Sequence, residues 1–209
     1  MIFPEQRVIF IHYPKTGGNS IQYALRNHTP DRIVARTPRQ DGYERFDVLS
    51  TQYKKLWKHS TLEEYYDAIG SDLFNYKIFI TIRNPFDRLV SYYFSPHRGN
   101  VIYSRADFYT FIGKVAPLTT FINLQKFSSI GENILNCITF LKFESLSKDF
   151  LKLTAELGLK NITLPHRNRG SRGSYHHYYD DELITVTRVL HNFELNIGGY
   201  SFDDNKSRN

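Results

Sequence analysis

An anion-binding loop is predicted directly after the first apolar run of the chain. The loop reads PKTGGNS over residues 14–20. Its glycine pair would let backbone amides approach an anion, and the start of a helix after it would add a favourable potential. Lys15 would supply a mobile positive charge. The predicted phosphate cradle comprises Pro14, Lys15, Thr16, Gly17, Gly18, Asn19 and Ser20.

This loop departs from the Walker A motif. That motif requires GxxxxGK followed by Ser or Thr, whereas here Lys15 precedes the glycine pair. The departure argues against an ordinary ATPase and favours anion chemistry that does not depend on a metal. No group of Asp, His or Cys residues has a spacing typical of metal ligands, so the sequence predicts no metal.

A second basic residue ends another apolar run. The segment YKIFITI, residues 76–82, predicts a buried strand, and Arg83 follows it. Open α/β sheets bind ligands at the carboxyl ends of strands, and the guanidinium fork suits a phosphate. Ser91 lies about two turns into the next predicted helix and could complete the contact. We interpret Asp87 and Arg88 as an ion pair that braces this helix.

Strand and helix patterns alternate along the chain and would position these residues. Strands are predicted at 7–12, 76–82 and 137–143, and helices at 19–27, at 60 to about 70, and at 86–94, 147–157 and 180–195. Residues 28–42 contain prolines and charges without periodicity and predict a surface loop. The pattern predicts an α/β fold: a P-loop-type strand-turn-helix and a central, largely parallel sheet flanked by helices, in one domain over residues 1–209.

Composition narrows the class of protein. The 209 residues carry 27 basic and 21 acidic side chains, a net charge of +6 that favours anionic ligands. Lone Cys137 excludes an intramolecular disulfide and a zinc site built on several cysteines. No apolar run reaches the roughly 18 to 20 residues that span a bilayer, and the start of the chain does not read as a secretory leader. We expect a cytoplasmic location, or the Golgi lumen if this is a trimmed eukaryotic domain.

Two segments together resemble a known family. Residues 10–21, FIHYPKTGGNSI, resemble the 5'-phosphosulfate loop of sulfotransferases that use 3'-phosphoadenosine 5'-phosphosulfate (PAPS), especially the carbohydrate branch that contains heparan sulfate 2-O-sulfotransferase. Residues 81–92, TIRNPFDRLVSY, resemble that family's 3'-phosphate site. The resemblance extends to LKFESL at 141–146, PHRN at 165–168 and the tyrosine pair at 178–179, but not to residues 28–58 or 95–135.

The resemblance implies transfer of a sulfuryl group from PAPS to an acceptor hydroxyl, with a sugar as the expected acceptor and 3',5'-adenosine bisphosphate as the product. Such an in-line transfer needs a positioned nucleophile and charge stabilisation, with little covalent work by the protein. Lys15 fits the stabilising role at the phosphate oxygen that becomes the leaving group. Arg169 and Arg172, in a basic, glycine-containing segment, match a late flap that would grip the 3'-phosphate.

The same resemblance points to a general base. The family places a histidine between its two nucleotide motifs, just before a helix, and His59 matches that position. The spacing of Ser60 with Glu63, repeated one step on by Thr61 with Glu64, predicts a capping box there. Glu63, Glu64 and His28 stay open as alternative bases.

Two other functions fit parts of the pattern. A P-loop kinase is the alternative enzyme, although the position of Lys15 disfavours it. A non-enzymatic module that binds a polyanion or nucleic acid would use the same basic residues only to contact phosphates. Because no nucleic-acid-binding signature is present, we expect no nucleic-acid partner.

Overall fold

A four-stranded sheet forms the centre of the protein. The computed structural model describes all residues except 41–42, 130, 132, 166–172 and 205–209. The strands are β1 (Ile2–Phe3), β2 (Val8–Ile11), β5 (Lys77–Ile82) and β6 (Ile138–Lys142), in the order β1-β2-β5-β6. Strands β2, β5 and β6 run parallel, and only β1 is antiparallel. The predicted α/β fold with a largely parallel sheet is confirmed.

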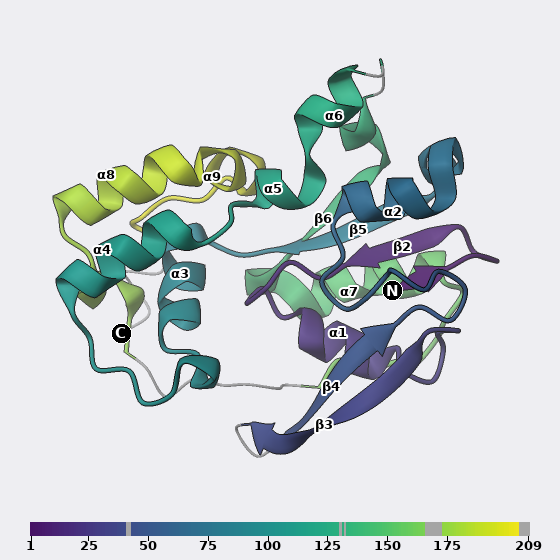
Figure 1. Ribbon diagram of the computed structural model, residues 1–209, viewed down its shortest axis with the longest axis horizontal. Helices are drawn as coiled ribbons and strands as arrows, with labels where there is room; N and C mark the ends of the chain where they lie inside the picture. Colours follow the sequence, from purple (N-terminus) through teal and green to yellow (C-terminus); the bar gives the residue numbers. More distant parts are fainter. Residues whose placement is uncertain (41–42, 130, 132, 166–172, 205–209) are drawn as a thin grey trace.

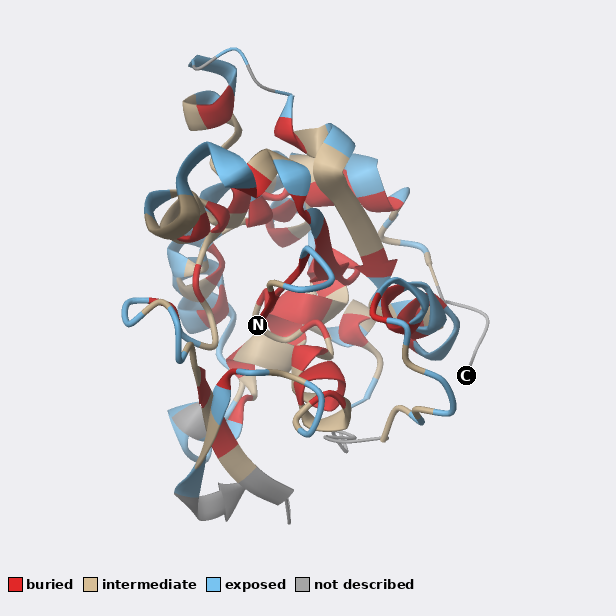
Figure 2. Ribbon diagram, turned by 90° about the vertical axis from the view of Figure 1, so that its right-hand side faces the viewer, coloured by how far each residue is buried: buried red, intermediate tan, exposed pale blue. Residues whose placement is uncertain are grey.

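Side chains alternate between the two faces of this sheet, as the twofold period of a strand requires. On β5, Ile78, Ile80 and Ile82 face one cluster of buried residues, and Phe79 faces another. On β2, Ile9 and Ile11 share the first cluster, while Val8 and Phe10 share the second. Figure 2 shows this buried centre in red. Both faces therefore need a covering layer of helices.

Different helices cover the two faces. Helices α2 (Leu62–Ile69), α5 (Leu118–Ile122) and α6 (Leu124–Ser129) contribute buried residues to the first cluster. Helices α1 (Gly18–Ala24) and α7 (Leu146–Glu156) contribute to the second. The predicted strands and helices exist at these places, with ends shifted by a few residues. Thr61 and Glu64 form the capping box of α2, whereas Ser60 Oγ accepts a hydrogen bond from the Trp57 amide.

A third cluster lies among helices beside the sheet. Helices α3 (Pro85–Tyr93), α4 (Arg105–Lys114), α8 (Asp181–Leu190) and α9 (Asn192–Gly198) pack together there (Figure 1). The prediction of one helix over residues 180–195 is wrong, because the backbone leaves helical geometry at His191 (φ −115°). Leu183 of α8 and Leu195 of α9 are both buried in this cluster, so each of the two helices contributes an apolar residue to it.

The segment predicted as a loop over residues 28–42 is instead mostly one strand of a hairpin. Strand β3 (Arg32–Gln40) pairs antiparallel with β4 (Tyr43–Leu49), and Figure 1 shows the hairpin beside α1. The register of the pair shifts between Arg36 and Gln40. Phe46 and Val48 of β4 pack into the second cluster. This tertiary contact fixes the hairpin.

Short 3-10 turns complete the described chain: Gly70–Asn75, Pro96–Arg98, Ile134–Cys137, Phe143–Ser145 and Tyr175–Tyr178. Within the described residues, no helix has the length and apolar character needed to cross a membrane.

Candidate active site

The predicted phosphate loop connects β2 to α1. Between the end of β2 at Ile11 and the start of α1 at Gly18, the backbone turns through positive φ angles at Lys15 (68°) and Gly17 (88°). A left-handed conformation is unfavourable for a residue with a Cβ, and such strain concentrates at functional sites. Lys15 is therefore held in a conformation that its own residue type does not favour.

The two glycines are required by close packing. A Cβ at Gly17 would lie 2.6 Å from Leu146 Cδ2, and a Cβ at Gly18 would lie 2.2 Å from His12 Cδ2. Real Cβ atoms do not approach other heavy atoms so closely. The pair thus lets the loop lie against the first residue of α7 on one side and the His12 ring on the other.

The side chain of Thr16 anchors the loop to the sheet. Its hydroxyl is fully buried, lies 2.6 Å from Thr81 Oγ1 on β5 and donates a hydrogen bond of 2.5 Å to the Tyr13 carbonyl oxygen. We predicted that Thr16 contacts a phosphate. Because its hydroxyl is buried against the sheet, only its backbone amide can make this contact. The remaining loop residues are partly exposed at Pro14 and Asn19 and buried at Ser20.

Arg83 lies beside the same loop, because β2 and β5 are parallel neighbours whose carboxyl ends meet at one edge. Its Nη1 donates to the Lys15 carbonyl oxygen at 3.2 Å. Its guanidinium carbon lies 4.0 Å from the centroid of the Phe143 ring, and the side chain is 10% exposed. The two predicted phosphate-binding segments are thus joined by a direct hydrogen bond.

The interpretation of Asp87 and Arg88 as an ion pair is wrong. Adjacent residues on a helix point in different directions, and Asp87 instead accepts hydrogen bonds from Arg83 Nε at 2.8 Å and Nη2 at 2.5 Å. Arg88 is buried, with its guanidinium carbon 4.2 Å from the centroid of the Tyr13 ring. Ser91 follows Asp87 by one turn of α3 and is partly exposed, so it lies on the same side of the helix.

His59 lies against the start of the phosphate loop. Its ring centroid is 4.5 Å from that of His12, and its Nδ1 lies 3.1 Å from the His12 carbonyl oxygen. Since a carbonyl oxygen only accepts, Nδ1 carries the hydrogen, and Nε2 holds the lone pair in the neutral ring. This tautomer is the one in which Nε2 can accept a proton.

The carboxylates weighed as alternative bases have other partners. Glu64 accepts the Thr61 amide within the capping box at 2.6 Å. Glu63 accepts from Lys126 Nζ at 2.8 Å and Asn123 Nδ2 at 2.7 Å, and these hydrogen bonds lower the pKa of its carboxyl below its ordinary value. A lowered pKa makes Glu63 a weaker base. His28 is exposed beyond α1.

Sequence reasoning missed two aromatic residues at this site. Phe143 packs under Arg83, and Trp57 lies 5.4 Å from His59 between ring centroids, edge to face, while remaining 46% exposed. Nothing in the local pattern distinguishes these rings from the many core aromatics. The sequence offered one clue, since Trp57 is the only tryptophan of the chain.

The predicted flap that would grip the 3'-phosphate is not covered by the described part of the chain. Arg169 and Arg172 fall in residues 166–172, outside the described residues. Among the residues that are described, no group of three or more His, Cys, Asp or Glu side chains is arranged to hold a metal ion.

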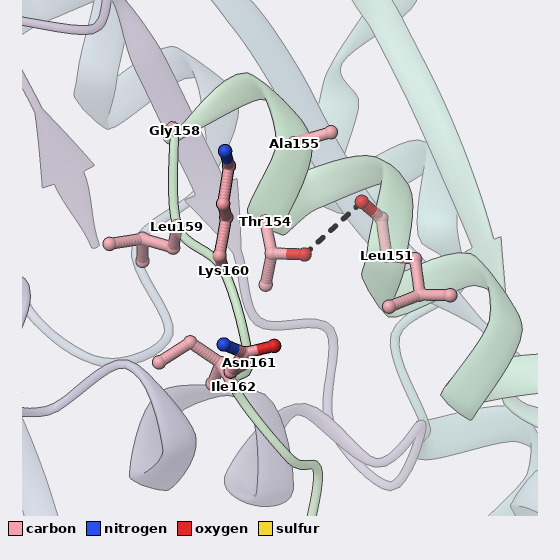
Figure 3. A pocket seen from close by; sticks show the side chains of 8 residues that line it. All are labelled: Leu151, Thr154, Ala155, Gly158, Leu159, Lys160, Asn161 and Ile162. Carbon is pink, nitrogen blue, oxygen red and sulfur yellow. Dashed lines mark hydrogen bonds between the residues drawn. The ribbon is translucent and has the colours of Figure 1, made fainter.

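A groove lies at the far end of α7 from Leu146. Its lining is mostly aliphatic, and its one dashed contact joins the Thr154 hydroxyl to the Leu151 carbonyl oxygen (Figure 3). None of the predicted site residues lines this groove. The chemistry-bearing residues therefore gather at the carboxyl edge of the sheet instead.

Comparisons with known proteins agree with this arrangement. A sequence model described as the sulfotransferase family matches residues 1–112, which include the phosphate loop, His59, Arg83 and Ser91. The fold is similar to that of mouse sulfotransferase SULT7A1, whose crystal structure is a complex with PAP: the TM-score is 0.52 at 16% sequence identity, over 93% of this chain and 88% of that one. No curated protein sequence matches the chain.

Proposed function

Because the chain belongs to the sulfotransferase family, we propose that it transfers a sulfuryl group from PAPS to an acceptor hydroxyl, on a carbohydrate, and releases 3',5'-adenosine bisphosphate (PAP). The observation that carries this proposal is the hydrogen bond from Arg83 Nη1 to the Lys15 carbonyl oxygen. It brings a basic residue for each phosphate of one nucleotide to a single edge of the sheet. The likeness to a PAP-bound mouse sulfotransferase supports this choice of nucleotide.

The residues at this edge have complementary roles in the proposed reaction. His59 Nε2 takes the proton of the acceptor hydroxyl as that oxygen forms a bond to sulfur. The bond between sulfur and the 5'-phosphate oxygen breaks in line, and its electron pair stays on the phosphate. Lys15 stabilises the negative charge that develops there. Arg83 and Ser91 hold the 3'-phosphate and so fix the nucleotide in register.

Trp57 supports a carbohydrate as the acceptor. Its half-exposed ring flanks His59, where an acceptor hydroxyl must arrive, and an exposed aromatic ring offers an apolar surface to the C–H face of a sugar. Lys54 and Lys55 are exposed on the same segment, which favours an acceptor that carries acidic groups. The location of the protein follows that of its acceptor, and we propose the cytoplasm.

The nucleotide is tested by thermal unfolding. A ligand at a hundredfold excess over its dissociation constant stabilises the folded state by about 2.7 kcal/mol, so PAP should raise the Tm more than ADP or ATP with magnesium. An equal shift with ATP would favour a kinase. No shift with any nucleotide, but one with heparin, would favour a polyanion-binding module.

The acceptor is tested by transfer of labelled sulfate from PAPS to neutral and uronate-containing oligosaccharides. Trp57→Ala should raise the KM for the sugar while the Kd of PAP stays unchanged, and Trp57→Phe should retain much of the wild-type KM. Transfer to phenols or steroids and to none of the sugars would exclude the carbohydrate acceptor without excluding PAPS.

A further inference from the structure

A buried carboxylate lies behind the phosphate loop, on the residue Glu194 of α9. Glu194 is 1% exposed. Its Oε1 accepts three hydrogen bonds from separate parts of the chain: Tyr13 Oη at 3.0 Å, the Leu118 amide at 2.8 Å and His191 Nδ1 at 2.9 Å. Burial opposes ionisation, but the hydrogen bond and charge of His191, the Leu118 amide and the charge of Arg88 together lower the pKa of Glu194 below its ordinary value. The group is therefore a buried anion.

This anion is connected to both predicted phosphate-binding segments. On one side it holds Tyr13, the residue directly before Pro14 and Lys15 of the loop. On the other side lies Arg88 of α3, whose guanidinium covers the Tyr13 ring and whose Nη2 shares the Ala116 carbonyl oxygen with Tyr13 Oη, at 3.5 and 3.1 Å. Helix α3 also carries Ser91 and Asp87, the carboxylate partner of Arg83. We call Glu194, Tyr13, Arg88 and His191 the hub. The hub thus contacts both the segment predicted to bind the 5'-phosphate and the segment predicted to bind the 3'-phosphate.

The stability of the fold does not explain this hub. Within the described part of the chain, three of its buried polar atoms lack a hydrogen-bond partner: Arg88 Nε, His191 Nε2 and Glu194 Oε2. Buried polar groups without partners destabilise a protein, and well-packed apolar residues can often replace a buried ion pair without loss of stability. A network that is costly for folding but fixes a geometry is expected at a functional site.

We propose that Glu194 is a positioning residue that acts through Tyr13 and Arg88 to fix the spacing between the 5'-phosphate loop and α3, so that both phosphates of one nucleotide are bound at once. This inference rests on the proposed function. When two binding segments are held at the right distance, the second phosphate binds in effect intramolecularly. If the spacing relaxes, each segment keeps its own affinity, and only the gain from binding both phosphates is lost.

Tyr13→Phe is the sharpest variant, since it removes the hydroxyl that Glu194 holds and keeps the ring under Arg88. We expect about a tenfold rise in the Kd of PAP, with less than about a twofold change for adenosine 5'-monophosphate or adenosine 3'-monophosphate. Glu194→Gln should show the same pattern. Tyr93→Phe is the matched control, because Tyr93 is equally buried on α3 but its hydroxyl contacts Ser104; it should leave all three Kd values unchanged.

Titration calorimetry with the three nucleotides distinguishes the outcomes. A loss confined to PAP in Tyr13→Phe supports the inference, even if Glu194→Gln does not fold. Equal losses for all three nucleotides, or a lower Tm with unchanged Kd values, would overturn it by reducing the hub to a structural role. If the wild-type protein failed to bind PAP, the proposed function would fail and this inference with it.

Discussion

The side chain of Arg83 donates a hydrogen bond to the backbone carbonyl oxygen of Lys15 at 3.2 Å, although 68 positions separate the two residues. The contact supports the strained turn at Lys15, and in the proposed function the same guanidinium group also holds the 3'-phosphate. A substitution at Arg83 should therefore affect both phosphate-binding segments, to different extents.

Arg83→Ala should weaken the binding of PAP by about 1.5 to 3 kcal/mol, the range for a hydrogen bond to a charged group. Adenosine 5'-phosphosulfate lacks the 3'-phosphate and should lose less, through the loop support alone. Ser91→Ala should weaken PAP binding to a smaller degree and leave the 5'-phosphosulfate unaffected. Calorimetric Kd values for both ligands test this, and equal losses in Arg83→Ala would refute the assignment of Arg83 to the 3'-phosphate.

Lys15→Ala should lower kcat by roughly a hundredfold or more and weaken PAP binding by less, because the charge matters most as the leaving oxygen becomes negative. Alanine retains a Cβ, so the unfavourable backbone conformation at φ 68° is common to both proteins. Single-turnover rates and PAP affinities measure the two effects separately. EDTA should leave wild-type activity unchanged. If EDTA abolished the activity and added magnesium restored it, a metal-free transfer would be contradicted.

His59→Ala should reduce turnover by roughly a hundredfold to ten-thousandfold with PAP affinity kept, the usual contribution of a positioned base. Wild-type turnover should fall at acidic pH as the His59 ring takes up a proton, and the variant should lack this dependence. His28→Ala is the control, since His28 is exposed beyond α1. If His59→Ala retained both turnover and the acidic limb, another group would have to act as the base.

Gly18→Ala should destabilise the protein by about 2 to 3 kcal/mol, because its Cβ would overlap the buried His12 ring. Gly113 on α4 has open space around its Cα, so Gly113→Ala should instead stabilise the protein by about 0.5 to 1 kcal/mol. Urea unfolding gives both free energies. A neutral Gly18→Ala would mean that the loop does not pack on His12 in solution.

Stability should decrease at acidic pH partly through His12. Burial, together with the charges of His59 and Lys58, lowers the pKa of His12 well below its ordinary value. Below about pH 6.5 the unfolded chain therefore binds a proton that the folded protein does not, and the free energy of unfolding falls by up to about 1.4 kcal/mol per pH unit. Above that pH, His12 is neutral in both the folded and the unfolded protein, and it no longer makes the free energy of unfolding depend on pH.

The measurement is the difference in unfolding free energy between pH 7.5 and 5.5, taken within each protein so that a general loss of stability cancels. In His12→Gln this difference should shrink by about 1 kcal/mol or more. The exposed His28→Gln should leave it unchanged. A wild-type pH dependence preserved in His12→Gln would show that other groups cause it.

The sequence by itself determined the three parallel strands of the sheet and the positions of Lys15 and Arg83 beyond two of them. Apolar runs that end in Gly or Pro turns and continue into capped helices specify parallel βα units, and parallel strands bring their carboxyl ends to one edge. Local spacing also placed His59 before α2, since a capping box depends only on residues within four positions. These features follow from short-range backbone rules.

Only the tertiary structure decided which side chains meet. Asp87 pairs with Arg83 and not with Arg88, because a helix turns adjacent residues apart and the end of β5 brings Arg83 over the helix. Strand β4 is held in place by the packing of Phe46 and Val48 against α1 and the sheet. Strand β3 forms by pairing with it, although residues 28–42 lack the periodicity typical of a strand. Tyr13 and Glu194 are 181 positions apart, and no local rule relates them. Burial and hydrogen bonding among distant residues arise only when the whole core forms, so no segment encodes them alone.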